Sequence, residues 1–152
     1  MNAQRVDIEV DISKGLHSFS LVGLADKAIE ESRDRVCAAI KNSGFKSPKQ
    51  RNEKVTVFLA PADLRKHGPI FDVSIALGYL QECKDIRFDP HQAIFFGELA
   101  LNGHIRPIQG ILPLVRFAKN AGFSHVFVPQ QNATEAALIG NVHAKRAARI
   151  HA

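Results

Sequence analysis

The sequence has few of the residues from which common binding sites are built. Its 152 residues include no tryptophan and a single tyrosine, Tyr79. Stacking of nucleic-acid bases needs exposed aromatic rings, yet most of the ten phenylalanines fall in strand or helix patterns that core packing explains. Phe45 stands among loop cations, where an anchor in the core is the better interpretation. A base-stacking platform is therefore not predicted.

Cysteine and histidine are also too scattered to indicate a metal site or a disulfide. Cys37 and Cys83 lie in helical patterns without CxxC spacing, so we interpret them as small, reduced core residues. The seven histidines lack the i, i+4 or His-x-Glu spacing of metal ligands. We expect no metal and no cofactor in this chain.

Two longer patterns are missing as well. No stretch approaches the 18 apolar residues of a membrane span, and the segment 1–5 is not followed by the apolar region of a signal peptide. We therefore expect a cytoplasmic protein with no membrane partner. The P-loop, Gly-x-x-x-x-Gly-Lys-Ser/Thr, is absent too. The chain itself is not expected to hydrolyse nucleotides.

The patterns that are present predict a single α/β (α+β) domain. With 45% hydrophobic residues, a chain of this length can bury about 70% of its unfolded surface. We place the domain at residues 1–140 and a basic tail at 141–152. The expected elements are strands at 5–12, 17–22, 54–60 and 125–128, a hairpin at 93–108, and helices at 26–42, 71–81, 112–120 and from about 132.

Three local motifs make the prediction more specific. Asn102-Gly103 favours a type I′ turn at the tip of the hairpin. The run Asn132-Ala133-Thr134-Glu135 resembles a capping box. Asp72 follows a Gly-Pro pair, and capping of the next helix is a better interpretation of this residue than catalysis.

Basic residues give the positive evidence for a function. The net charge is +5, and the loop from Phe45 to Glu53 has cations in it and after it. Such a loop can follow a phosphate backbone, although an ordinary solvated loop has the same composition. The tail cations Lys145, Arg146 and Arg149 either extend this surface or keep the tail soluble. The predicted nucleic-acid contacts are Lys46, Lys49, Arg51, Lys54, Arg65 and Lys66.

Two segments carry a resemblance to a known family. The first, Gly68-Pro69-Ile70-Phe71-Asp72, and the second, from Gly97 to Gly110, are similar to the signature of Lon-protease-type domains. Over about residues 6–139 the chain more closely resembles the N-terminal, ChlI-type (magnesium-chelatase-like) domain of the ComM/YifB family. The stretches that carry this resemblance are Val10–Leu16, Val22–Asp26, Ala38–Phe45 and Leu59–Leu64.

The resemblance implies a fold and a role. The expected fold is that of ribosomal protein S5 domain 2, a Lon-protease-type two-layer fold with a mixed sheet. In full-length relatives this domain is attached to an AAA+ ATPase that remodels branched DNA during natural transformation. ATP and Mg²⁺ are expected only in such an AAA+ domain, which this chain would meet in cis or in trans.

The same resemblance argues against catalysis by this chain. A Lon protease carries its nucleophilic serine after Gly-Pro and an activating lysine after the Pro-Ile-x-Gly segment. Ile70 and Leu112 hold these places here, and neither side chain can attack a carbonyl or move a proton. Ser74 is the nearest hydroxyl, one helical turn further on, and Lys119 lies about two turns beyond Leu112.

Three functions stay open at this point. We favour a non-catalytic assembly and DNA-contact domain, with single-stranded or branched DNA as partner. The alternatives are a Lon-like serine hydrolase that uses an unrecognised residue such as Ser74, and a purely protein-binding scaffold. Because relatives carry an extra strand at each end, we expect an unpaired sheet edge here and a homo-oligomer.

Overall fold

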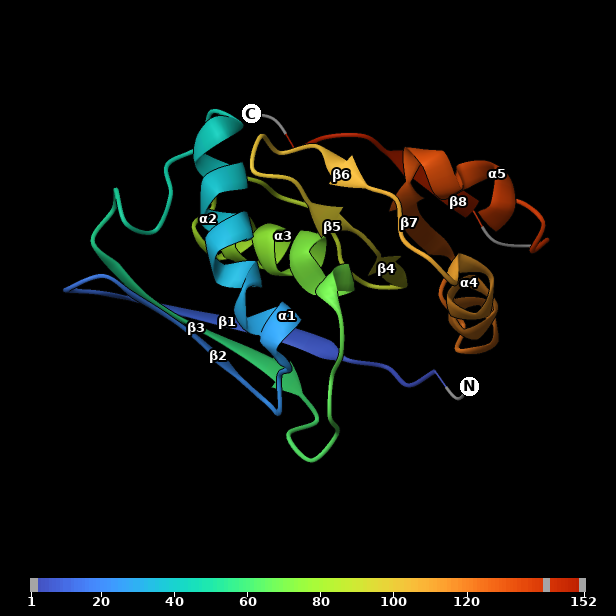
Figure 1. The fold of residues 1–152 in the computed structure, drawn as a ribbon, viewed down its shortest axis with the longest axis horizontal. Helices are drawn as coiled ribbons and strands as arrows, with labels where there is room; N and C mark the ends of the chain where they lie inside the picture. The colour runs from blue at the N-terminus through green and yellow to red at the C-terminus, as the bar shows by residue number, and fades with distance from the viewer. Residues whose placement is uncertain (1–2, 141–142, 151–152) are drawn as a thin grey trace.

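The computed structural model describes residues 3–140 and 143–150. It consists of two three-stranded sheets joined through helices that lie between and beside them (Figure 1). The first sheet and its helices come from the N-terminal half, and the second sheet with α4 and α5 comes from the C-terminal half. This arrangement confirms the predicted α+β fold with mixed pairing of strands.

The first sheet has strand order β1-β3-β2. Its strands are β1 (Asp7–Lys14), β2 (Ser18–Val22) and β3 (Glu53–Ala60). β1 runs antiparallel to the central β3, and β2 runs parallel to it. Val55, Val57 and Leu59 of β3 are buried, while Lys54 before them and Phe58 between the last two are exposed. The period-2 pattern at 5–12 thus predicted β1, because one face of the sheet contacts solvent, and the strands expected at 17–22 and 54–60 are present as β2 and β3.

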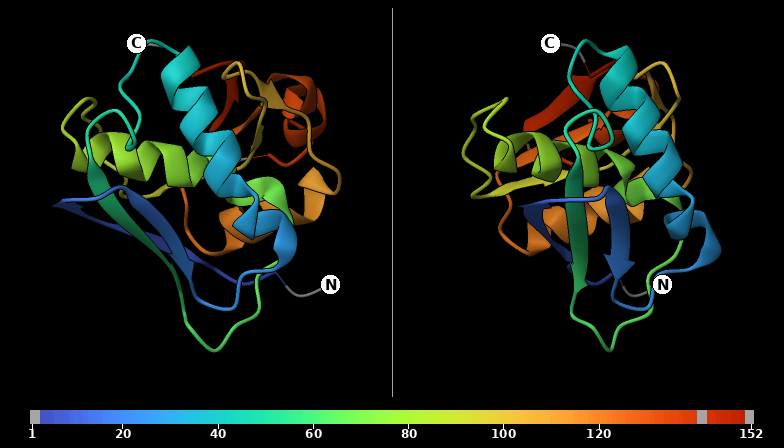
Figure 2. Two further views of the ribbon diagram at one scale, coloured as in Figure 1. Left: turned by 60° about the vertical axis from the view of Figure 1, so that its left-hand side comes forward. Right: turned by 90° about the vertical axis from the view of Figure 1, so that its left-hand side faces the viewer.

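Three helical segments cover the other face of this sheet (Figure 2). They are α1 (Lys27–Glu30), α2 (Ser32–Asn42) and α3 (Asp72–Glu82), with a 3₁₀ turn η1 (Pro69–Phe71) before the last. The single helix expected at 26–42 is interrupted at Glu31. Immediately after this break Ser32 is fully buried, and its hydroxyl donates to Asp72. A helix-period pattern does not predict such an interruption.

The second sheet is parallel, with order β4-β7-β8. Its strands are β4 (Ala93–Phe95), β7 (His125–Pro129) and β8 (His143–Ala147). The helices α4 (Ile111–Asn120) and α5 (Ala133–Ala136) pack against it, and the 3₁₀ turn η2 (Gln130–Asn132) precedes α5. Ile111, Val115 and Val126 are fully buried in this second core.

The predicted hairpin at 93–108 is wrong in its first half. β4 pairs with β7, and only the short strands β5 (Glu98–Leu99) and β6 (Ile105–Arg106) form a hairpin. The type I′ prediction is also wrong, because that turn needs positive φ at both central residues. Here Gly103 has φ +88°, whereas Asn102 does not lie in the left-handed region.

The capping box predicted at Asn132 is wrong as well. Asn132 precedes α5, but its side chain makes no capping bond to that helix. Its amide instead bonds Ile108, accepting from the backbone N–H and donating to the carbonyl, each at 2.9 Å. Asn132 therefore ties α5 to the segment before α4, a long-range contact that outweighs the local motif.

The expectation that the sheet lacks its last strand is wrong too. Part of the segment 141–152 forms β8, which pairs with β7 along its length. Residues 148–150 then continue alongside 103–105 through backbone bonds. Residues 141–142 and 151–152, also placed in the tail, lie outside the described part of the chain. Among the described residues, no helix is long and apolar enough to cross a bilayer.

Candidate functional site: a Gly-Pro turn without a nucleophile and a basic loop

The Gly-Pro segment forms a firmly held turn at the start of α3. Gly68 has φ +82°, a conformation that side chains with a Cβ rarely adopt, and Pro69 opens the 3₁₀ turn. The N–H of Gly97 donates to the carbonyl of Ile70 at 3.2 Å, and the N–H of Val73 donates to Gly97 at 3.3 Å. These bonds join the two segments that carry the Lon-type resemblance, which are far apart in sequence.

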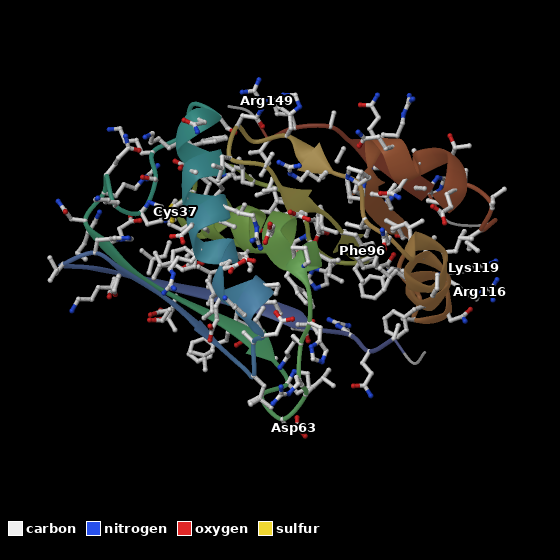
Figure 3. The ribbon with its side chains drawn as sticks, viewed as in Figure 1. Cys37, Asp63, Phe96, Arg116, Lys119 and Arg149 are labelled. Atoms are coloured by element: carbon white, nitrogen blue, oxygen red, sulfur yellow. The ribbon has the colours of Figure 1, made fainter. Side chains whose placement is uncertain are left out.

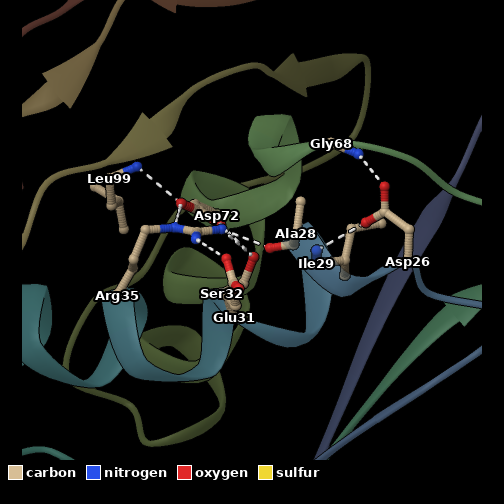
Figure 4. A network of polar contacts seen from close by, with 9 residues as sticks. All are labelled: Asp26, Ala28, Ile29, Glu31, Ser32, Arg35, Gly68, Asp72 and Leu99. Atoms are coloured by element: carbon tan, nitrogen blue, oxygen red, sulfur yellow. Dashed lines mark hydrogen bonds and ion pairs between the residues drawn. The ribbon is translucent and has the colours of Figure 1, made fainter.

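Asp72 organises the polar contacts behind this turn (Figure 4). Its carboxylate is fully buried and accepts from the Ser32 hydroxyl, from Arg35 Nε at 2.7 Å and from the Leu99 N–H at 3.0 Å. The hydrogen bond from Arg35 to Asp72 raises the pKa of Arg35 further above its ordinary value. Phe71 is the N-cap of α3, and the bonds of the Asp72 carboxylate go to other elements, so the capping prediction is wrong. It joins α2, α3 and β5 instead.

Asp26 binds the first residue of the turn, Gly68, through a second set of contacts that does not involve Asp72. Its Oδ1 caps α1 by accepting from the Ile29 N–H at 2.9 Å, and its Oδ2 accepts from the Gly68 N–H at 3.0 Å (Figure 4). Burial by itself would raise the pKa of Asp26, but the two backbone N–H groups and nearby His67 together hold it below its ordinary value. Asp26 is therefore a link between the start of α1 and the Gly-Pro turn.

We expect Asp26→Ala to lower the free energy of unfolding by about 0.5 to 2 kcal/mol at neutral pH, the range for loss of a helix cap. A lowered pKa in the folded state stabilises the fold above the unfolded value near 3.9. That stabilisation is lost as the pH falls through the folded value. The difference between wild type and variant in urea unfolding should therefore shrink below about pH 4. Asp63→Ala, in an exposed loop, is the control and should change little at any pH.

In Lon proteases the serine and the lysine form a catalytic dyad. The two corresponding positions here, Ile70 and Leu112, hold only hydrocarbon side chains. Ile70 is partly buried and packs against the second core, and Leu112 is a partly exposed residue in the first turn of α4. Lys119 lies at the outer end of α4, away from the turn (Figure 3). Ser74 donates to the carbonyl of Phe95 at 3.3 Å. No cluster of three or more His, Cys, Asp or Glu that could hold a metal occurs among the residues described.

The structure divides the predicted basic contacts into separate groups. Lys46, Lys49 and Lys54 are exposed on the loop after α2 and at the start of β3. Arg51 lies in the same loop, but its guanidinium pairs with Asp85. Lys66 is only 2% exposed, and its ammonium donates to the carbonyl of Pro61. Lys66 therefore does not contribute to an exposed basic surface.

Arg65 is separated from the other cations by the length of β3. The eight residues of this strand span about 23 Å at roughly 3.3 Å per residue. Asp63, two residues before Arg65, lies at the tip of the loop beyond the far end of the strand (Figure 3). We therefore restrict the candidate surface to Lys46, Lys49 and Lys54, which we call the basic loop.

One cation from the C-terminal segment joins this region. Arg149 is exposed and donates to the carbonyl of Asn42, at the end of α2, at 3.4 Å (Figure 3). The exposed Lys41 belongs to the same helix end. The contact crosses more than one hundred residues, so no pattern in the sequence could place Arg149 there.

Comparison with known proteins identifies the family of this chain. The model of a family described as subunit ChlI of Mg-chelatase matches residues 8–132, which include the Gly-Pro turn, the buried Asp72 and the basic loop. The chain belongs to the ChlI family. Since the match ends before β8, the last strand lies outside the shared region.

Individual relatives are similar to this chain over most of its length. Competence protein ComM of Haemophilus influenzae is 39% identical over 142 residues, which cover 93% of this chain and 27% of ComM. Uncharacterized protein YifB of Escherichia coli is 37% identical over 142 residues, 91% of this chain and 27% of YifB. Lon protease 2 of Bacillus subtilis is more distant. It is 25% identical over 140 residues, which cover 84% of this chain and 25% of the length of Lon protease 2. The chain thus spans little more than a quarter of these relatives.

Proposed function

We propose that this chain is the non-catalytic assembly and DNA-contact domain of a ComM-like AAA+ ATPase that acts in DNA branch migration during natural transformation. One observation carries the proposal: the Gly-Pro turn is held by Asp26 and Asp72 while Ile70 and Leu112 occupy the two dyad positions. A scaffold maintained without a nucleophile or a base suits binding and assembly. ATP and Mg²⁺ would act in an AAA+ domain attached in cis or supplied in trans.

DNA contact is assigned to the basic loop. Lys46, Lys49 and Lys54 are exposed, and none of them has a salt-bridge partner among the residues that the structure describes. Their ammonium groups are therefore available to replace the counterions of a phosphate backbone. With no tryptophan and one buried tyrosine, binding should depend on backbone charge and show little base preference.

The direct test is fluorescence anisotropy of labelled single-stranded and forked DNA, titrated with the purified chain at 20 to 200 mM salt. Binding that weakens steeply with rising salt supports the proposal, since each neutralised phosphate of a single strand contributes a slope of about −0.7. Absence of binding at the lowest salt contradicts DNA contact. The scaffold alternative, in which the chain binds only protein, would then stand.

The hydrolase alternative has one observation in its favour. Ser74 and His91 both line a cavity of about 560 Å³ between α3, β4 and the residues before β1. However, Ser74 donates its hydroxyl to Phe95, and His91 bonds the exposed Asp89 at 2.9 Å. The oxygen of Ser74 thus has a carbonyl as its partner, which cannot take its proton.

We therefore expect no covalent labelling of the folded chain by a fluorophosphonate probe, detected by intact-mass spectrometry. Ile70→Ser should also stay unlabelled, because the restored hydroxyl still lacks a lysine at position 112. A Lon protease with its serine and lysine in place serves as the positive control. Labelling that disappears in Ser74→Ala would support the hydrolase and overturn the non-catalytic assignment.

A further inference from the structure

The two edges of the first sheet are differently protected. β3 is the central strand, so β1 and β2 each have one side that faces away from it. Within residues 3–140 and 143–150, no strand pairs with the outer side of β2. An open edge presents backbone N–H and C=O groups that can pair with another strand.

β2 lacks the features that usually prevent edge pairing. Its five residues, Ser-Phe-Ser-Leu-Val, include no charge, no proline and no glycine. β1, by contrast, carries Asp7, Glu9 and Asp11 on its exposed face. Two copies of β1 paired with each other would bring these carboxylates together, and like charges facing each other across strands are destabilising. Self-pairing is therefore disfavoured at β1 and permitted at β2.

We propose that β2 pairs antiparallel with β2 of a second copy of this chain, about a twofold axis through Ser20. The strand has the right pattern for this register. Phe19 would lie opposite the partner subunit's Leu21, so that the two core-facing side chains of each strand continue one apolar layer. On the outer face Ser20 would lie opposite its own copy, and Ser18 would lie opposite the partner subunit's Val22.

Exposed apolar side chains at the end of β2 support the same pairing. Val22 is 43% exposed, and Leu24, two residues further, is 51% exposed. Phe58 of β3, which is aligned with Val22 in the sheet, is 41% exposed. In the proposed register Val22 gains the partner subunit's Ser18 as a cross-strand neighbour, and the sheet is extended next to Leu24 and Phe58. Because the contact is isologous, it closes at two copies.

This interface deepens the assembly role proposed above and is tested separately from DNA contact. In the proposed register the two copies of residue 20 are about 5 Å apart between Cα atoms, within the range of a disulfide. The two copies of residue 18 are separated by four residues along the strands, or about 14 Å. We expect Ser20→Cys to form a disulfide-linked dimer under mild oxidation, and Ser18→Cys to form none.

Non-reducing electrophoresis after a time course with an oxidant distinguishes the outcomes. Wild type is the control for the native Cys37 and Cys83, both of which are partly buried. Burial raises the pKa of Cys37 to about 11, which keeps it in the unreactive thiol form. Equal cross-linking of both variants, or none in either, would overturn the proposed register.

A pair of lysine substitutions tests the dimer without cross-linking. Ser20→Lys places two cations next to each other at the twofold axis, whereas Ser13→Lys adds the same charge on β1 of the same exposed face. In sedimentation velocity at increasing concentration, wild type and Ser13→Lys should dimerise while Ser20→Lys stays monomeric. A wild type that is monomeric at millimolar concentration, or a Ser20→Lys that still dimerises, contradicts the proposal. Equal DNA affinity of monomeric Ser20→Lys and dimeric Ser13→Lys, which carry the same added charge, separates the two roles.

Discussion

Replacing Asp72 with alanine is expected to lower the free energy of unfolding by about 3 to 5 kcal/mol, the usual cost of removing one partner of a buried ion pair. Asp72 is fully buried and the Arg35 side chain is 18% exposed, so the remaining guanidinium cannot reach water freely. The Ser32 hydroxyl and the Leu99 N–H would also lose their acceptor. Urea unfolding followed by circular dichroism measures the loss directly.

Glu31→Ala is the matched control for this experiment. Glu31 also faces Arg35, but at 4.0 Å and with a side chain that is 56% exposed, so its removal should cost less than about 0.5 kcal/mol. A double variant with hydrophobic residues at both positions, Arg35→Met with Asp72→Leu, should recover much of the stability because no buried charge is left unpaired. A loss below about 1 kcal/mol in Asp72→Ala would show that the pair does not hold the turn.

Reversal of three charges in the basic loop is expected to have the largest effect on DNA binding. In the triple variant of Lys46→Glu, Lys49→Glu and Lys54→Glu, the affinity for single-stranded DNA should fall about 100-fold at 50 mM salt, and the salt slope should decrease by about 2. Arg51 is left unchanged because it pairs with Asp85, and its reversal would disturb the fold of the loop.

A second triple variant separates a local contact from an effect of net charge. Lys27, Arg116 and Lys119 are exposed cations on α1 and α4, and their replacement by glutamate changes the net charge by the same amount. If the basic loop contacts the backbone, this control should keep most of the affinity and nearly all of the salt slope. Equal losses in both variants would assign the binding to long-range attraction, with no defined contact surface.

The sequence predicted most elements but missed local detail, such as the break at Glu31 and the turn at Asn102, and it did not predict contacts between distant elements. The alternation of β1 indicated a strand because its outer face contacts solvent. β4 was assigned to a hairpin because β5 and β6 follow it closely, yet its partner β7 lies thirty residues further on. Asn132 had a capping motif in sequence, but its partner in space is Ile108.

The candidate site shows the same division. That Ile70 and Leu112 stand where Lon proteases have serine and lysine was evident from the Gly-Pro and Pro-Ile-x-Gly segments, because alignment of the two segments is enough to show it. Which cations are exposed and unpaired was not evident. Composition does not show that Lys66 is buried or that Arg51 has an acidic partner. The role of Asp72 required knowing that α2 lies against α3, which brings Arg35 to the carboxylate.

The course of strand β8 has a consequence for the order in which the chain folds during synthesis. The first sheet is complete once residue 60 has left the ribosome, whereas the second sheet needs β8 and therefore residue 147. Until then the apolar face of β7 and α4 has only part of its cover, which is the state in which nascent chains aggregate. The first core waits for the same segment, because Ile150 and Ala147 pack in it, so both cores reach full cover only when the last strand has emerged.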